Sequence, residues 1–308
     1  MHQVRSTGSD FVVRRRYDPP MKRVQLLLVP YDSGRRDWRM GQGPERLVTG
    51  LTARLDALGF AVERSVVVPE SGAPEAEIAT AFELMRLLAL RVRAARQAGR
   101  FPLVLSGNCS TAPGTLAGLT PLSRAVFWFD AHGDLNTPET TSSGYLDGMA
   151  LATALGWCWR RMTDAVPGFE AVPEAVTLLL GARDLDPPEA ERVSRSAVRV
   201  LSRESLPTTQ LDHVLQSLRS TVEAGYVHCD LDVLDPGQGQ ANPFPVPGGL
   251  SVAEVERTIG AIGQVIPVRA AALAAYAPQF DADGRVAEAA IRIGQSIVAA
   301  AADCEGAH

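Results

Sequence analysis

The stretch Ala125-Val-Phe-Trp-Phe-Asp-Ala-His-Gly-Asp134 joins five consecutive apolar residues to a run of acidic and imidazole side chains. A continuous apolar run of this length is typical of a strand that is buried on both faces of a parallel sheet. The same arrangement recurs where the run Tyr226–Cys229 leads into Asp230-Leu-Asp232. In open α/β sheets, ligands bind at the carboxyl ends of the strands. Both acidic runs occupy that position, and they therefore mark the expected functional site.

Strand-like runs alternate along the chain with segments of helical period. The apolar runs are Val24–Val29, Leu103–Leu105, Ala125–Phe129, Val176–Leu180, Val198–Leu201, Tyr226–Cys229 and Val268–Leu273. The segments of helical period are Pro44–Leu58, Ala76–Ala98, Thr111–Leu119, Asp147–Trp159, Thr209–Val222, Val252–Val265 and Arg285–Ala301. This alternation predicts an α/β fold with a parallel sheet covered by helices on both faces. We expect residues 21–308 to form one domain, preceded by a flexible N-terminal arm at residues 1–20.

Composition excludes several classes of function. The 308 residues are 46 % hydrophobic and 21 % charged, and 30 basic against 35 acidic residues give a formal charge of −5, which does not favour nucleic-acid binding. No apolar run approaches the length of a membrane span. Four cysteines in a chain of this length do not form a disulfide framework, so we expect a reducing, cytoplasmic setting.

The two acidic runs predict a metal site. Residues i, i+2 and i+4 of a strand point to one face, so Asp130, His132 and Asp134 can converge, as can Asp230 and Asp232. Taken alone, the first run could reflect loop polarity or helix capping, but two such clusters left unpaired would be costly. Oxygen-rich ligation with one imidazole suits manganese, with iron, zinc or cobalt as alternatives. Two such ions activate water for hydrolysis at an electrophilic carbon or phosphorus.

The ordered motifs closely resemble the arginase/agmatinase (ureohydrolase) family. The resemblance rests on Asp130-Ala-His-Gly-Asp-Leu-Asn-Thr-Pro138 and Asp230-Leu-Asp-Val-Leu-Asp-Pro236, supported by Leu105–Ser110, Gly181–Pro187 and Gly248–Leu250. It implies a three-layer α/β/α sandwich with a parallel sheet of eight strands. It also implies a dimanganese centre, a small amino-acid-like substrate and a homo-oligomer, either a trimer or a hexamer.

Carried over position by position, the resemblance implies two overlapping ligand sets. The first is Cys109, Asp130, Asp134 and Asp230, and the second is Asp130, His132, Asp230 and Asp232. Asp232 would also hold or orient the attacking hydroxide. In the arginine-cleaving members of the family, the residues that hold the α-carboxylate and α-amine of the substrate match Asn136, Ser143, Asp186 and Glu189.

Four positions depart from the family pattern. Cys109 replaces the usual first histidine ligand; it is either a thiolate ligand or a small buried cysteine that has lost ligation. The branch that hydrolyses N-hydroxyarginine resembles this sequence in having such a cysteine. Asp147 replaces the proton-shuttle histidine, and it could relay protons, bind a cationic substrate end, or cap the helix expected near Gly148. Ala275 replaces a glutamate that pairs with the guanidinium, and Phe244 replaces a small polar residue.

These departures favour a weakly basic substrate end over an ordinary guanidinium. The leading hypothesis is therefore a metal-dependent hydrolase that cleaves a C–N bond of a guanidino-type amino acid, with N-hydroxyarginine as one candidate. One alternative is a hydrolase of the same fold that acts on a side-chain amide or formimino group. The other is a binding relative that has lost turnover.

Overall fold

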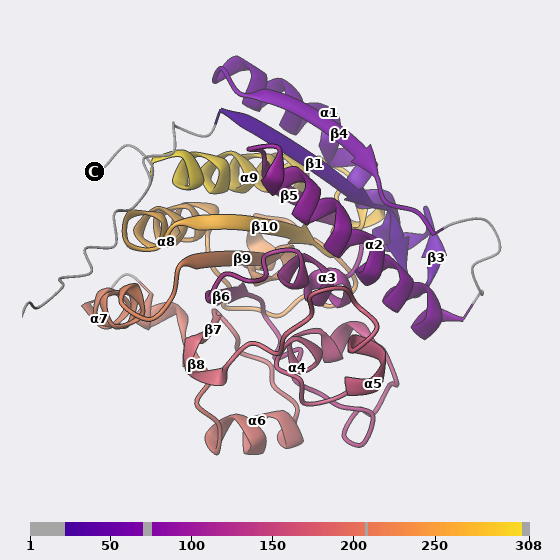
Figure 1. The fold of residues 1–308 in the computed structure, drawn as a ribbon, viewed down its shortest axis with the longest axis vertical. Helices are drawn as coiled ribbons and strands as arrows, with labels where there is room; N and C mark the ends of the chain where they lie inside the picture. Colours follow the sequence, from indigo (N-terminus) through magenta and orange to yellow (C-terminus); the bar gives the residue numbers. More distant parts are fainter. Residues whose placement is uncertain (1–21, 70–75, 207–208, 304–308) are drawn as a thin grey trace, which may run out of the picture.

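The computed structural model describes residues 22–69, 76–206 and 209–303. An eight-stranded parallel sheet forms its centre (Figure 1). Across the sheet the strands are β4 (Ala61–Val66), β1 (Arg23–Val29), β5 (Phe101–Ser106), β10 (Val268–Ala274), β9 (Ala224–Asp230), β6 (Arg124–Phe129), β7 (Thr177–Leu180) and β8 (Arg199–Leu201). A short antiparallel hairpin pairs β2 (Tyr31–Asp32) with β3 (Arg35–Arg36). The predicted N-terminal arm lies outside the described residues.

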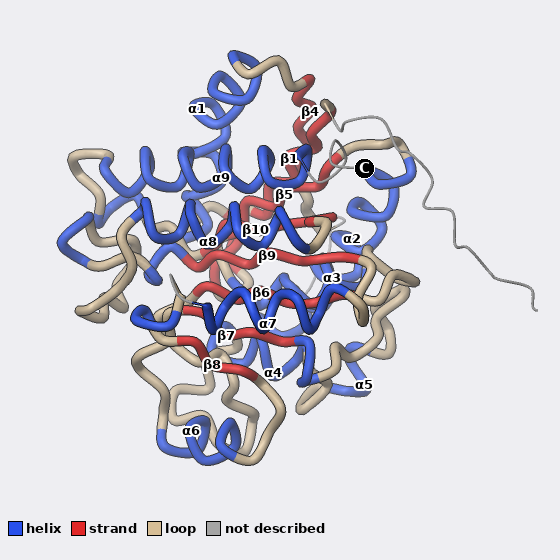
Figure 2. The backbone as a smooth tube through the Cα atoms, turned by 90° about the vertical axis from the view of Figure 1, so that its left-hand side faces the viewer, coloured by secondary structure: helices blue, strands red, loops and turns tan. Residues whose placement is uncertain are grey.

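Helices cover both faces of the sheet, which confirms the predicted three-layer arrangement (Figure 2). One face carries α1 (Gly43–Ala57), α7 (Thr209–Arg219), α8 (Val252–Val265) and α9 (Arg285–Asp303). The other carries α2 (Glu77–Gln97), α3 (Ala112–Ala117) and α4 (Ala150–Ala154). In Figure 1 the short helix α6 (Pro187–Ser194) lies beyond β8, and α5 (Arg160–Thr163) lies beside α4. No helix among the described residues combines the length and apolar composition needed to cross a bilayer.

The strands are apolar on both faces because each face builds a separate core. On β1, Leu26 and Leu28 belong to the core under α1 and α9, whereas Leu27 and Val29 belong to the core under α2. Successive side chains of a strand point to opposite faces, so a strand between two helical layers is apolar at most of its positions. The predicted apolar runs all form strands for this reason.

Several elements differ from the sequence prediction, which did not include β2, β3, α5 or α6. Strand β4 was not predicted, because its sequence Ala-Val-Glu-Arg-Ser-Val is partly polar. It is one of the two edge strands of the sheet and pairs with β1. The helix predicted over Asp147–Trp159 is shorter, since only Ala150–Ala154 is α-helical and Gly156 has a positive φ of 71°. A glycine in the left-handed region ends the helix there.

Candidate metal centre and its cavity

The two acidic runs meet at the carboxyl edge of neighbouring strands. Strands β6 and β9 pair in parallel up to Phe129 and Cys229, so Asp130 and Asp230 follow side by side. Cys109 begins a 3₁₀ turn directly beyond β5, on the far side of β10. Ligands in open α/β sheets collect at this edge. The fold therefore brings the predicted metal ligands together from three strands.

The first group of potential ligands contains Cys109, Asp130 and Asp134. One ligand atom from each lies within 4.8 Å of the others, and all three residues are buried. The Cys109 Sγ also lies 3.0 Å from Oδ2 of Asp230, to which it donates a hydrogen bond. The thiol thus faces the carboxylates rather than the surrounding core, which is the orientation that ligation requires.

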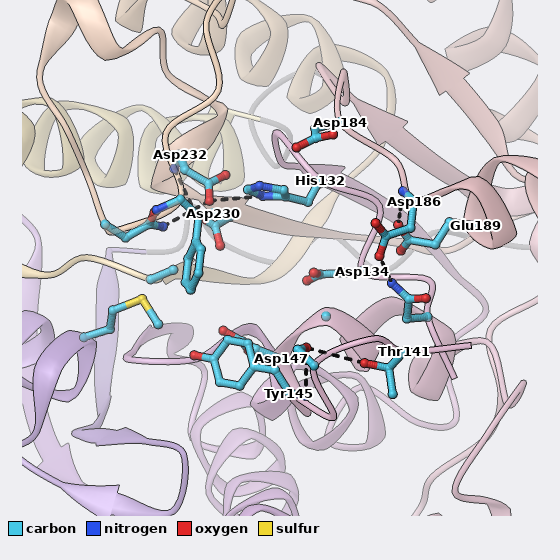
Figure 3. A pocket seen from close by; sticks show the side chains of 17 residues that line it. His132, Asp134, Thr141, Tyr145, Asp147, Asp184, Asp186, Glu189, Asp230 and Asp232 are labelled. Carbon is cyan, nitrogen blue, oxygen red and sulfur yellow. Dashed lines mark hydrogen bonds and ion pairs between the residues drawn. The ribbon is translucent and has the colours of Figure 1, made fainter. Parts of the chain in front are cut away.

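The second group contains Asp130, His132 and Asp232. His132 Nδ1 lies 3.4 Å from Oδ1 of Asp130 and 3.3 Å from Oδ2 of Asp232. Figure 3 shows the His132 ring beside the carboxylates of Asp230 and Asp232. Asp130 belongs to both groups, and a carboxylate with two oxygens can serve two cations at once.

The electrostatics of this cluster fit cations. Burial, reinforced by neighbouring carboxylates, raises the pKa of Asp130, Asp134 and Asp230 above their ordinary values. Burial lowers the pKa of His132, but its contacts with Asp130 and Asp232 outweigh this and raise it to about 12. Buried like charges at this density need a positive partner. Carboxylates, one imidazole and one thiol form a donor set that divalent manganese, iron, cobalt or zinc accepts.

A cavity of about 250 Å³ opens above the cluster. Its wall includes every residue predicted for the substrate side: Asn136, Ser143, Asp147, Asp186, Glu189 and Phe244. Figure 3 shows Asp186 and Glu189 on one side of the cavity and Asp147 with Tyr145 on another. The cavity is large enough for an amino acid with a long side chain.

The side of the cavity around Asn136 and Asp186 is prearranged by hydrogen bonds. The Asn136 side-chain amide donates to Oδ2 of Asp186 at 2.8 Å. Glu189 Oε1 accepts from the N–H of Leu135 at 2.7 Å, and its Oε2 accepts from the N–H of Asp186 at 2.8 Å. Glu189 therefore ties together the loops that follow β6 and β7. The Ser143 hydroxyl accepts from the N–H of Tyr145 at 3.1 Å and remains on the cavity wall.

Asp147 lies on the cavity wall with both oxygens engaged. Oδ1 accepts from the N–H of Ser110 at 2.8 Å, and Oδ2 accepts from the Asn108 amide at 2.9 Å. Burial raises the pKa of Asp147 to about 8. It makes no capping bond to its own helix, so the interpretation as a helix cap is wrong. Instead it holds the turn that carries Cys109.

Phe244 and Ala275 shape the remaining wall. The Phe244 ring is 42 % exposed, stands edge-on to His132 with centroids 6.5 Å apart, and lies 6.1 Å from the Tyr145 ring. Ala275 is buried directly after β10, with a positive φ of 60°. No carboxylate occupies position 275, so this position offers a cation no partner.

Two residues that hold the cluster were not predicted. Asn242 donates to Oδ2 of Asp232 at 3.0 Å, and Asn108 joins Asp147 to Tyr145. Asn242 lies in the Gly/Pro-rich loop between β9 and α8, and long ordered loops at strand ends are where functional sites are often built. Asn108 offers no such signal, because its role depends on a contact with a residue 39 positions away.

Comparison with known proteins agrees with this geometry. The family model described as "Arginase family" matches residues 22–300. The chain belongs to the arginase family. An arginase from Bacillus caldovelox is 29 % identical over 89 % of this chain and 97 % of its own length. The N(omega)-hydroxy-L-arginine amidinohydrolase of Streptomyces lavendulae is 34 % identical over 67 % of this chain and 71 % of its own.

Solved structures of arginase-family proteins share the fold. The Bacillus caldovelox arginase structure has a TM-score of 0.82 at 27 % identity, and covers 90 % of this chain and 98 % of its own. The agmatine ureohydrolase of Thermoplasma volcanium, with a TM-score of 0.67 at 19 % identity over 92 % and 90 % of the chains, shares the fold alone. Arginase-family membership confirms the predicted fold and the predicted enzyme class, a hydrolase acting on C–N bonds of linear amidines.

Proposed function

We propose that this protein is a dinuclear metal-dependent hydrolase that cleaves the guanidino C–N bond of an arginine-like amino acid, with N-hydroxyarginine as the preferred substrate. The observation that carries the proposal is the sharing of Asp130 between two groups of potential ligands at the base of a cavity. The 34 % identity to a hydroxyarginine amidinohydrolase supports the substrate class.

Two Mn²⁺ ions are the proposed cofactors, and other divalent cations suit the same donors. Cys109, Asp130, Asp134 and Asp230 would hold one ion, and Asp130, His132, Asp230 and Asp232 the other. Bound there, the ions would supply a water-derived nucleophile near neutral pH.

The chain's own residues provide orientation and proton transfer. Asp232 is fixed by the N–H of Ala131 at 3.2 Å and by the Asn242 amide at 3.0 Å, so it can orient the attacking water. Attack on the amidine carbon and cleavage of its bond to the side-chain nitrogen release ornithine and hydroxyurea from N-hydroxyarginine, or urea from arginine. The departing nitrogen needs a proton, which we assign to the carboxyl group of Asp147 on the cavity wall.

The two ends of the cavity suit the two ends of such a substrate. Asn136, Ser143 and Asp186 present polar atoms for the α-amine and α-carboxylate, and Glu189 holds their loops in place. Around Phe244 the wall is aromatic and carries no carboxylate at position 275. A weakly basic hydroxyguanidine can enter this environment uncharged, and it then loses less hydration free energy than a charged guanidinium does.

The test is product analysis with purified, manganese-loaded protein on L-arginine, Nω-hydroxy-L-arginine and agmatine. We expect ornithine from the first two, a higher kcat/KM for the hydroxylated compound, and little turnover of agmatine, which has no α-carboxylate. Asp130→Asn should abolish turnover, because it alters both ligand groups. Absence of ornithine from either α-amino substrate would refute the proposal.

The aromatic, uncharged wall at Phe244 and Ala275 favours one competing candidate, hydrolysis of a side-chain amide or formimino group. The same assay with side-chain amides and formimino amino acids decides between the two substrate classes by its products. A third outcome, no bound metal and no turnover, would indicate a binding relative.

We also propose a homo-oligomer, a trimer or a hexamer, in line with the family resemblance. Size-exclusion chromatography with light scattering measures the mass of the assembly.

A further inference from the structure

The carboxylate of Asp147 is aimed by a neighbouring turn. Its Oδ1 accepts from the N–H of Ser110 at 2.8 Å and its Oδ2 accepts from the side chain of Asn108 at 2.9 Å. All three residues are buried. Because both donors belong to the turn that carries Cys109, the direction of this carboxylate is set jointly with the metal-ligand turn.

Asn108 can fill this role in only one orientation. Its Nδ2 donates both to Asp147 and, at 3.0 Å, to the hydroxyl oxygen of Tyr145, while its Oδ1 accepts from the N–H of Ser33 at 2.9 Å. Turning the amide over would set its oxygen against a carboxylate and its NH₂ group against an N–H. The surroundings therefore require an amide here, since a carboxylate has no donor for Asp147.

Tyr145 extends the same chain of hydrogen bonds. Its hydroxyl donates to Oδ1 of Asp32 at 3.2 Å, and the fully buried Asp32 is held by the N–H of Met40 at 3.3 Å and by Arg39 Nε at 3.5 Å. The Tyr145 proton is committed to Asp32, so its oxygen can only accept from the cavity. Tyr145 and Asp147 thus present acceptor oxygens side by side on the cavity wall.

We propose that Asn108 is a positioning residue that aims the Asp147 carboxylate, beside the Tyr145 oxygen, at the N–H and O–H donors of the substrate's guanidino end. This inference rests on the proposed function and adds a determinant of specificity to it. A paired set of acceptors suits a hydroxyguanidine or guanidine, which carries several donors on one planar group. A side-chain amide offers a single donor nitrogen and would use the pair less well.

The experiment is a double-mutant cycle at positions 108 and 147. Asn108→Asp sets two acceptors against each other, and we expect KM for Nω-hydroxy-L-arginine to rise about tenfold or more, with a lower thermal unfolding midpoint. In the double variant Asn108→Asp/Asp147→Asn, the new amide at 147 can donate to the new carboxylate at 108 and still accept from Ser110. Its unfolding midpoint should recover, while KM stays high because the carboxylate no longer faces the substrate.

Two further variants separate positioning from general damage. Tyr145→Phe removes one hydroxyl and keeps the ring, and should raise KM by a smaller factor without loss of fold. Gln25→Glu makes the same amide-to-acid change on β1, where Gln25 contacts Ser65, and should leave KM unchanged.

Each result has a defined meaning. A wild-type protein inactive on both L-arginine and Nω-hydroxy-L-arginine refutes the proposed function, and the inference falls with it. An active wild type with KM unaffected by Asn108→Asp refutes the inference alone. Recovery of both KM and the unfolding midpoint in the double variant also overturns it, since a carboxylate at position 147 would then be unnecessary.

Discussion

Asp134→Asn should change the stability of the protein in opposite directions with and without metal. Asp134 is buried, and its side chain makes no hydrogen bond to another described residue. Its φ of 52° lies in the left-handed region, which asparagine tolerates well. The substitution therefore removes one charge and one ligand oxygen with little other disturbance.

The repulsion that is removed without metal and the metal binding that is lost with metal are of similar size. The ligand atoms of Cys109, Asp130 and Asp134 lie within 4.8 Å of one another. Like charges at that separation repel by about 3.5 kcal/mol at an effective dielectric of about 20. Without metal, the variant should thus be more stable by about 1–3 kcal/mol, because some of these groups are already protonated. With a cation at about 100 times its Kd, losing one site costs about 2.7 kcal/mol. At roughly 2 °C per kcal/mol, each effect is measurable as a shift in Tm.

The assay is thermal unfolding in EDTA and in excess MnCl₂, with metal content measured in parallel. In EDTA the variant should melt above the wild type, and in manganese below it. Burial and neighbouring carboxylates raise the pKa of Asp134, so its cost to stability is absent below the ordinary pKa of about 3.9 and grows as the pH rises above it. The difference in EDTA should therefore shrink on acidification. Asp184→Asn, the same change at an exposed carboxylate of the cavity, is the control. An equal loss in both buffers would refute the reasoning.

Three other outcomes are expected. Cobalt-loaded protein should show a thiolate-to-metal absorption band that Cys109→Ser removes; a band unchanged by the substitution would mean that the thiol does not ligate. Glu189→Gln places an NH₂ group against a main-chain N–H and should lower the free energy of unfolding in urea by about 1–3 kcal/mol, whereas a neutral effect would contradict its tie between loops. Hydrogen bonds from Ser251 and Arg203 outweigh burial and lower the pKa of Glu254 to about 2. Glu254→Gln should accordingly be less stable than the wild type above the ordinary pKa of about 4.3, and this difference should disappear as the pH falls to 2. Urea titrations over that pH range would measure it.

The strands were predictable where they are buried on both faces, and less so elsewhere. Phe127 and Leu179 lie in continuous apolar runs, and such runs identify central strands directly. Strand β4 has Glu63 and Arg64 near its middle, because an edge strand of this sheet is partly in water. Helix α6 was not predicted, because it has few apolar residues, although Asp186 and Glu189 form a capping box at its start.

The candidate site was predictable where ligands follow strands. Asp130 and Asp232 stand at fixed offsets from buried runs, so their convergence follows from the sheet. Asn108 and Tyr145 lie in loops, and their contacts depend on how two loops from different strands fold against each other. Local sequence does not predict how these loops pack, and therefore it did not predict the hydrogen bonds around Asp147.

The place of β10 has a consequence for biosynthesis. β10 lies between β5 and β9, and Leu273 pairs with Leu105 and Cys229, although it is added to the chain long after both. Until the ribosome has released β10, β5 and β9 each present an unpaired edge, and such edges invite aggregation. Cys109 follows β5, so it cannot join the carboxylates that follow β6 and β9 during that interval. Nascent chains of this protein should therefore depend on chaperone protection until nearly the whole sequence has emerged, and capture of metal by the group that contains Cys109 must follow that moment.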